Sequence, residues 1–339
     1  MQFGLYAPLP HVCAGAPKIV ASVSGALEPL PDLTIDPAFD LSRDICLAAD
    51  KAGFDIILFA ERHLGADIEA WIHAAAVTAQ TDRITAMVAV HPGLWHPVMV
   101  AKMAASLDRI CKGRMAVNLV TGWNVEEHRM FGGDTLHGTE ERYLRAEEFV
   151  DVLRGVWSSL PYSKNGAIFE IEGVELRLRP ASRQTPEIFT ASRSSRGLDM
   201  VAKVGDWWFV DFDRDASCLE EVEESIRLSI ADVCTRAEKL GRKVRFALNP
   251  YVAFGQSREV AMEQSLSVAN SRPDRYIRTL QHSVGPMKTG CIGSPDQVRS
   301  QLRNYEALGI ELFLLKFPPT LEAVEEIREE IIAPLGRRF

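Results

Sequence analysis

Apolar runs of strand length alternate with segments of helical period along almost the whole chain. The eight runs are Phe3–Ala7, Ile56–Ala60, Ile84–Val90, Met115–Thr121, Glu187–Ala191, Trp207–Asp211, Phe246–Phe254 and Glu311–Phe317. Most are continuously apolar rather than alternating, which is typical of parallel strands covered by helices. Eight such strands, each followed by a helix, predict an α/β fold: a (β/α)8 TIM barrel with loop insertions at its C-terminal face. The 339 residues are enough for one barrel, so we expect a single domain over residues 1–339.

Helical periods and glycines support this reading. The clearest predicted helices are Leu41–Lys51, Pro97–Cys111, Arg142–Ser158, Leu219–Leu240 and Leu321–Ile332. Gly53, Gly205 and Gly309 each follow a helical pattern and precede a strand, so we expect them to close helices in the left-handed conformation. The alternative is an open doubly wound sheet, which is less favoured because no G-x-G-x-x-G follows the first strand.

Three stretches interrupt the alternation. Residues Pro8–Ala38 form a long first loop, and Phe169–Leu178 alternates apolar and charged residues around Gly173, which predicts a small exposed hairpin. Residues Ser271–Cys291 resemble a mobile lid. Long insertions at the C-terminal ends of barrel strands are where such a fold carries its chemistry.

Composition excludes several classes of protein. A net charge of −8 argues against a nucleic-acid-binding face. No apolar run approaches the roughly 20 residues of a membrane-spanning helix. The first residues lack the basic stretch of a signal peptide, so we expect a cytoplasmic protein. Six dispersed cysteines favour free thiols, and eight histidines without ligand spacing predict no metal site.

Polar residues end several of the apolar strands, and the C-terminal ends of barrel strands carry the active site. The strand-end residues are His63 after the second strand, His91 and Trp95 after the third, Asn118, Thr121 and Trp123 at the fourth, and Asp211 at the sixth. Asn118 is the most informative, because an amide inside an apolar strand must find a hydrogen-bond partner. A bound cofactor is the most economical one.

The fifth strand runs into Ser192, Arg193, Ser194 and Ser195, directly before a helix expected from about Arg196 to Lys203. Serine hydroxyls and free backbone N–H groups at a helix N-terminus form an anion site, and an adjacent arginine pairs well with phosphate. The alternative is ordinary serine capping beside a surface arginine.

A combination of motifs then resembles a known family, over nearly the whole chain. The motifs are His91-Pro92-Gly93-Leu94-Trp95-His96-Pro97, Asp108-Arg109, Gly113-Arg114, Asn118-Leu119-Val120-Thr121-Gly122-Trp123 and Glu141-Arg142-Tyr143. They resemble the bacterial luciferase-like, FMNH2-dependent monooxygenases, and most of all the dimethylsulfone and alkanesulfonate branch. The resemblance implies FMN as a reduced cosubstrate delivered by a separate NAD(P)H-dependent flavin reductase. It also implies oxygenation of a small organosulfur compound with O2, and a homodimer or homotetramer.

The resemblance also implies roles for individual residues. Asn118, Val120 and Thr121 would lie beside the flavin ring, Tyr143 would contact the flavin tail, and Ser192, Arg193, Ser194 and Ser195 would hold the phosphate. His63 and His91, with Asn118 and Thr121, are the candidate catalytic residues. The expected substrate pocket is lined by Trp95, Trp123, Asp211, Asn249, Tyr251, Lys316 and Phe317.

The chain departs from the alkanesulfonate pattern at the substrate end. Asn249 and Tyr251 stand where those enzymes place Arg and His, Asp211 replaces a Trp, and Phe317 replaces a Tyr. Losing fixed cations argues against a permanently anionic substrate, although Lys316 and Lys288 remain candidates for an anionic group.

Three alternatives stay open. The substrate is a heterocycle such as a pyrimidine, or the cofactor is a deazaflavin used for hydride transfer. The third alternative is a flavin-binding relative without turnover, against which the polar strand ends argue.

Overall fold

The computed structural model describes residues 1–8, 37–61, 68–122, 129–131, 138–181, 185–270, 287–318 and 320–336. Eight parallel strands close into a barrel in the order β1-β12-β9-β8-β7-β4-β3-β2. They are β1 (Gln2–Tyr6), β2 (Ile56–Phe59), β3 (Thr85–Val90), β4 (Met115–Leu119), β7 (Glu187–Ala191), β8 (Trp207–Phe209), β9 (Arg245–Leu248) and β12 (Ile310–Leu315). The predicted TIM barrel is confirmed.

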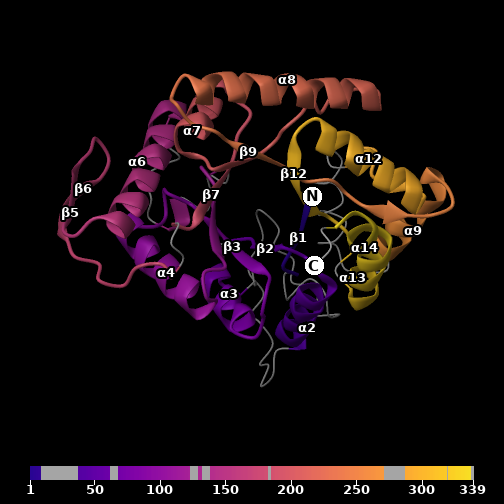
Figure 1. The fold of residues 1–339 in the computed structure, drawn as a ribbon, viewed down its shortest axis with the longest axis horizontal. Helices are drawn as coiled ribbons and strands as arrows, with labels where there is room; N and C mark the ends of the chain where they lie inside the picture. Colours follow the sequence, from indigo (N-terminus) through magenta and orange to yellow (C-terminus); the bar gives the residue numbers. More distant parts are fainter. Residues whose placement is uncertain are drawn as a thin grey trace.

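Helices surround the barrel, as Figure 1 shows. They are α2 (Pro37–Ala52), α3 (Ala70–Thr78), α4 (Pro97–Ile110), α6 (Thr139–Ser158), α7 (Ser195–Val204), α8 (Leu219–Glu238), α9 (Arg258–Asn270), α12 (Pro295–Ala307), α13 (Leu321–Ile327) and α14 (Ala333–Leu335), with a π-helical turn η1 (Arg328–Ile332) between the last two. The five helices expected from the sequence are present with small shifts of their ends, and the last of them divides into α13 and η1. Within the described residues, no helix is long and apolar enough to span a membrane.

Two hydrophobic layers follow from the period of two along each strand. The inner layer fills the barrel with side chains from seven strands: Ile56, Leu58, Met87, Ala116, Phe189, Trp207, Ala247, Leu312 and Leu314. The alternate residues, such as Val117 and Leu119 of β4, face the helices. Since Ala116 points inward, Asn118 two residues later is placed on the same inner face. Tyr6 and Phe209 pack against the inner layer.

Glycine completes the inner layer at β1. A Cβ added to Gly4 would lie 2.4 Å from Ile56 Cγ2 and 2.9 Å from Leu314 Cδ1, so no larger residue fits without displacing these side chains. The interior is therefore packed, and free space for a ligand is expected only above it, at the C-terminal ends of the strands.

The seventh predicted strand, Phe246–Phe254, is wrong as a single element. It divides into β9 and β10 (Ala253–Phe254), and β10 pairs with β11 (Ile292–Gly293) in a separate two-stranded sheet. Pro250 lies in the interruption, where it has no N–H for a ladder, although its carbonyl accepts from Lys316 N at 2.9 Å.

Two other local expectations also need correction. The hairpin pairs β5 (Tyr162–Asn165) with β6 (Glu170–Val174), so its turn precedes β6 and Gly173 lies inside a strand. Gly53 and Gly309 have φ of 90° and 103°, as expected, but Gly205 has φ of −72°. Gly205 is instead required by close packing, since a Cβ there would lie 2.8 Å from Thr190 Oγ1. The first loop and most of the expected lid fall outside the described residues.

Candidate active site

Among the expected site residues, Asn118 is buried and has an unsatisfied side-chain oxygen. Its side chain is 8% exposed, and its Oδ1 is buried without a hydrogen-bond partner in the described part of the chain. An unsatisfied buried acceptor costs about 1–3 kcal/mol, so it marks a place where a ligand donor is favoured. Val120 and Thr121 follow at the rim and are half-buried.

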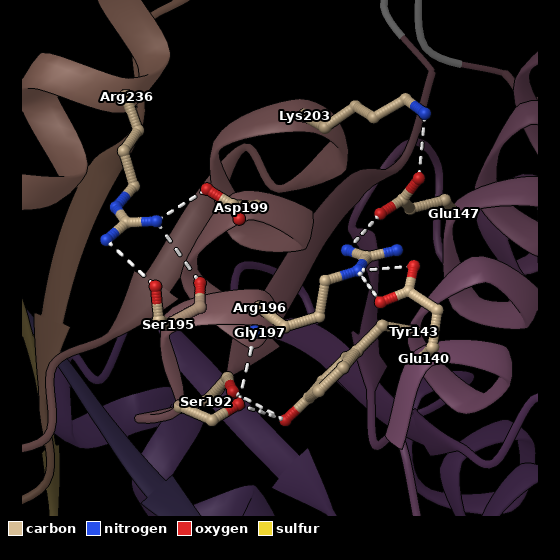
Figure 2. A network of polar contacts seen from close by, with 11 residues as sticks. Glu140, Tyr143, Glu147, Ser192, Ser195, Arg196, Gly197, Asp199, Lys203 and Arg236 are labelled. Carbon is tan, nitrogen blue, oxygen red and sulfur yellow. Dashed lines mark hydrogen bonds and ion pairs between the residues drawn. The ribbon is translucent and has the colours of Figure 1, made fainter. Parts of the chain in front are cut away.

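The serine turn after β7 forms a compact polar cluster with Tyr143 of α6 (Figure 2). Tyr143 Oη lies 3.0 Å from Ser192 Oγ and 2.9 Å from Ser194 Oγ. Ser194 is the N-cap of α7, and its Oγ accepts from Gly197 N at 3.2 Å. The serine capping considered from the sequence is therefore present, and Tyr143, expected at the flavin tail, hydrogen-bonds with two of the serines expected at the phosphate. Capping and anion binding are compatible, since free N–H groups remain at the helix start.

Gly197 makes this cluster possible. A Cβ at this position would lie 1.8 Å from Ser192 Oγ and 2.7 Å from Tyr143 Oη. The first turn of α7 therefore approaches the hydroxyl groups as only glycine can.

The arginines around the cluster differ in whether their charge is already balanced. Arg196 Nη1 contacts Glu147 at 2.6 Å and its Nε contacts Glu140 at 2.8 Å, while Lys203 binds the other oxygen of Glu147 at 2.7 Å. Arg193, in contrast, is exposed and makes no hydrogen bond or ion pair with the residues that the structure describes. Unlike that of Arg196, the charge of Arg193 is not balanced by any described carboxylate, and its pairing with an incoming anion stays a prediction.

A second arginine, on α8, secures the turn from the other side. Arg236 Nη1 donates to the Ser195 carbonyl at 3.2 Å and to Asp199 at 2.5 Å, and its Nη2 donates to Ser195 Oγ at 3.3 Å (Figure 2). Sequence reasoning missed Arg236, because it lies 41 residues from Ser195 and no local pattern connects the two. Ser195 is consequently tied to α8.

The positive surroundings also act on Tyr143. Partial burial raises the pKa of its phenol, but the hydrogen bonds with Ser192 and Ser194 and the charge of Arg142 outweigh this and leave the pKa below its usual value. The Arg142 guanidinium lies 5.2 Å from the centre of the Tyr143 ring, and its buried Nε has no partner among the described residues. The cluster is therefore suited to a negatively charged group.

Opposite β4, the ends of β1, β9 and β12 bring another set of polar residues together. Asn249 Nδ2 donates to Tyr6 Oη at 2.5 Å, and Lys316 Nζ lies 5.5 Å from the centre of the Tyr6 ring. Burial, with a smaller contribution from Arg214, lowers the pKa of Lys316 to about 8. Tyr6 was not expected from the sequence, although it ends the first strand two residues after Gly4, on the inner face.

The remaining expected residues occupy varied positions. Trp95 is half-buried with its Nε1 unpartnered in the described part, and His91 is buried at the end of β3. Asp211 pairs with Arg214 at 3.4 Å. His63 and Trp123 lie outside the described residues.

Two expected substrate residues and Lys288 are placed elsewhere. Phe317 packs in the outer layer, with its ring centre 6.1 Å from that of Phe54. It follows the outward-facing Phe313 and Leu315 with a period of two. Tyr251 forms a bridge with Lys316, but its side chain packs with the small sheet of β10 and β11. Lys288 donates to the carbonyls of Arg214 and Ala216 at 2.5 Å and 2.9 Å, so its ammonium already has partners.

The described residues contain no group of three or more His, Cys, Asp or Glu side chains arranged to hold a metal ion.

Residues 19–312 match the model of a family described as luciferase-like monooxygenase. The chain is 28% identical, over 332 residues and 88% of each chain, to an FMNH2-dependent dimethylsulfone monooxygenase of Pseudomonas putida. It is also 28% identical, over 336 residues, to the enzyme of the same name from Pseudomonas fluorescens, covering 90% of this chain and 89% of the relative.

Solved structures share the fold. A long-chain alkane monooxygenase superposes with a TM-score of 0.77 at 18% identity, over 99% of this chain and 91% of the other. The oxygenating constituent of 3,6-diketocamphane monooxygenase of Pseudomonas putida, solved with FMN, superposes with a TM-score of 0.71 at 17% identity, over 99% of this chain and 98% of the other. The expected resemblance is confirmed, and the FMNH2 dependence expected with it agrees with the names of the curated relatives. The chain belongs to the luciferase-like monooxygenase family.

Proposed function

We propose that this protein is a two-component monooxygenase that uses O2 and FMNH2, delivered by a separate flavin reductase, to oxygenate a small organosulfur compound. The observation that supports the proposal best is the buried Oδ1 of Asn118, which has no hydrogen-bond partner among the described residues and lies next to the cluster of Tyr143, Ser192 and Ser194. Two curated relatives named as FMNH2-dependent dimethylsulfone monooxygenases support the choice of cofactor and of substrate class.

The residues fit FMN at both ends. Asn118 of β4 pairs in register with Phe189 of β7, only three residues before Ser192, so the amide and the serine turn lie on adjacent strands. A cofactor with a polar ring at one end and a phosphate at the other suits this pair of sites. Arg193 would balance the phosphate charge, while Ser194 and the start of α7 supply hydrogen bonds.

Reduced FMN, when bound, supplies the electrons with which O2 is activated. The chain's own residues would orient the ring through Asn118 and keep water away, with Trp95 as one half-buried wall. Oxygenation thus requires of the protein mainly a fixed cofactor and a dry site.

The test is an anaerobic titration with FMNH2, followed by a turnover screen with O2. We expect tight binding of FMNH2 and consumption of a sulfone in preference to a sulfonate or a pyrimidine. Preferential binding of a reduced deazaflavin, or FMNH2 binding with no turnover of any substrate, would contradict the proposal.

Arg193→Ala tests the phosphate-binding turn independently of the rest of the site. We expect FMNH2 affinity to fall at least about tenfold, as for loss of a charge-assisted hydrogen bond. Lys112→Ala is a control for loss of one positive charge, because Lys112 lies in the turn before β4, at the opposite end of the barrel. Equal affinity of both variants for FMNH2 would remove Arg193 from the site.

A further inference from the structure

Tyr6, Asn249 and Lys316 lie on the wall of the barrel that faces Asn118. Their strands β1, β12 and β9 are consecutive in the barrel, and β12 is the fourth strand from β4 in either direction. Asn118 and Lys316 therefore end strands on opposite sides of the barrel. A substrate that reaches a cofactor beside Asn118 has its far end directed toward these three residues.

Their hydrogen bonds leave donors available. The Tyr6 oxygen accepts from Asn249 Nδ2, and its own O–H has no acceptor among the described residues. Lys316 Nζ forms no hydrogen bond or ion pair in the described part of the chain and lies over the face of the Tyr6 ring, 5.5 Å from its centre. The half-buried ammonium of Lys316 and the phenol of Tyr6 therefore lie side by side, and both have hydrogen-bond donors that no described residue uses.

A purely structural role explains this arrangement poorly. Long lysine side chains ordinarily extend to keep the ammonium in water, and a buried charge is ordinarily paired. Lys316 instead keeps its ammonium group over the Tyr6 ring. Because no anionic partner lies among the described residues, the charge of this ammonium is available to bind a ligand. Burial lowers its pKa, which agrees with a site short of acceptors.

We propose that Tyr6 and Lys316 bind the acceptor oxygens of the substrate, and that Asn249 positions the Tyr6 hydroxyl for this task. The substrate class is then a small compound whose polar group carries two acceptor oxygens, such as a sulfonyl group, with its apolar part toward the cofactor. This assignment rests on the proposed function, which places the cofactor on the opposite wall.

Dimethyl sulfone, dimethyl sulfoxide and dimethyl sulfide provide the test, because they carry two, one and no acceptor oxygens on the same carbon frame. Their dissociation constants are measured by ligand-observed NMR, with and without FMNH2 under anaerobic conditions. For the native protein we expect binding to weaken from sulfone to sulfoxide to sulfide, by at least about tenfold overall.

Lys316→Met keeps the length of the side chain and removes its donors. We expect this variant to bind the sulfone and the sulfoxide with nearly equal affinity, because only the Tyr6 donor remains, whereas Lys316→Arg retains the full order. Tyr6→Phe, which removes a single oxygen atom and preserves packing, should reduce the difference between sulfone and sulfoxide. Lys288→Met is the matched control and should behave like the native protein, since Lys288 donates to backbone carbonyls elsewhere.

An unchanged order of affinities in both Lys316→Met and Tyr6→Phe would overturn the assignment, as would the absence of any order in the native protein. Failure of FMNH2 to bind the native protein would instead contradict the proposed function. The two failures are distinguishable because the ligand series is measured with and without the cofactor.

Discussion

Gly197→Ala is the most selective perturbation of the candidate phosphate site. The added methyl group would lie 1.8 Å from Ser192 Oγ and 2.7 Å from Tyr143 Oη, well inside van der Waals contact. Ser192 must rotate and Tyr143 must shift, which breaks their 3.0 Å hydrogen bond and disturbs the 2.9 Å bond between Tyr143 and Ser194.

The magnitude follows from what the turn would lose. Loss of one hydrogen bond to a charged phosphate corresponds to about 1.5–3 kcal/mol. We therefore expect the Kd for FMNH2 to rise about 10- to 100-fold. Global stability should change little, because alanine is favoured over glycine within a helix by up to about 1 kcal/mol, which offsets part of the strain.

The assay is an anaerobic fluorescence titration with FMNH2, paired with urea denaturation of the same samples. Gly138→Ala is the matched control, since a Cβ at Gly138 would meet no atom within 4 Å. An unchanged Kd for Gly197→Ala in a folded protein would refute the role of this turn in binding phosphate.

Three further predictions concern other parts of the barrel. Asn118→Leu should retain or increase the free energy of unfolding, because it removes a buried acceptor without a described partner, while FMNH2-dependent turnover falls; unchanged turnover would exclude Asn118 from the site. Burial lowers the pKa of His73 from 6.5 to about 4, so the folded state keeps this histidine neutral while the unfolded chain takes up a proton. The free energy of unfolding should therefore decrease by up to about 3 kcal/mol as the pH falls from about 6.5 to about 4, and urea denaturation should show a weaker pH dependence for His73→Gln. Arg245→Met should lower the free energy of unfolding by about 1–2 kcal/mol, because the guanidinium lies 3.8 Å from the centre of the Trp207 ring and pairs with Glu311. The affinity for FMNH2 should not change, since these contacts lie outside the candidate site. A loss of FMNH2 affinity as large as the loss of stability would contradict this prediction.

Features that depend on local pattern were predictable from the sequence. The barrel follows from eight apolar runs, and Asn118 stands out because a polar residue in such a run has few explanations. The serine turn was also accessible, since a helix cap is defined by neighbours in sequence. These predictions needed no knowledge of which distant segments meet.

Features that depend on distant contacts were not predictable in the same way. Arg236 and Gly197 gain their meaning only when α6, α7 and α8 are placed side by side (Figure 1). The resemblance implied Phe317 in the substrate pocket, but the period of two along the strand directs its side chain to the outer layer. Tyr6 was missed because an aromatic residue at the end of an apolar strand is ordinarily a core residue. Only the fold shows that its hydroxyl accepts a hydrogen bond from the distant Asn249.

The most direct test of the central claim is a crystal structure of the protein with bound FMN. We expect a phosphate within hydrogen-bond distance of Ser194 and close to Arg193, and a ring edge that donates a hydrogen bond to Asn118 Oδ1. A phosphate bound at another loop, or a ring that leaves Asn118 without a partner, would contradict it.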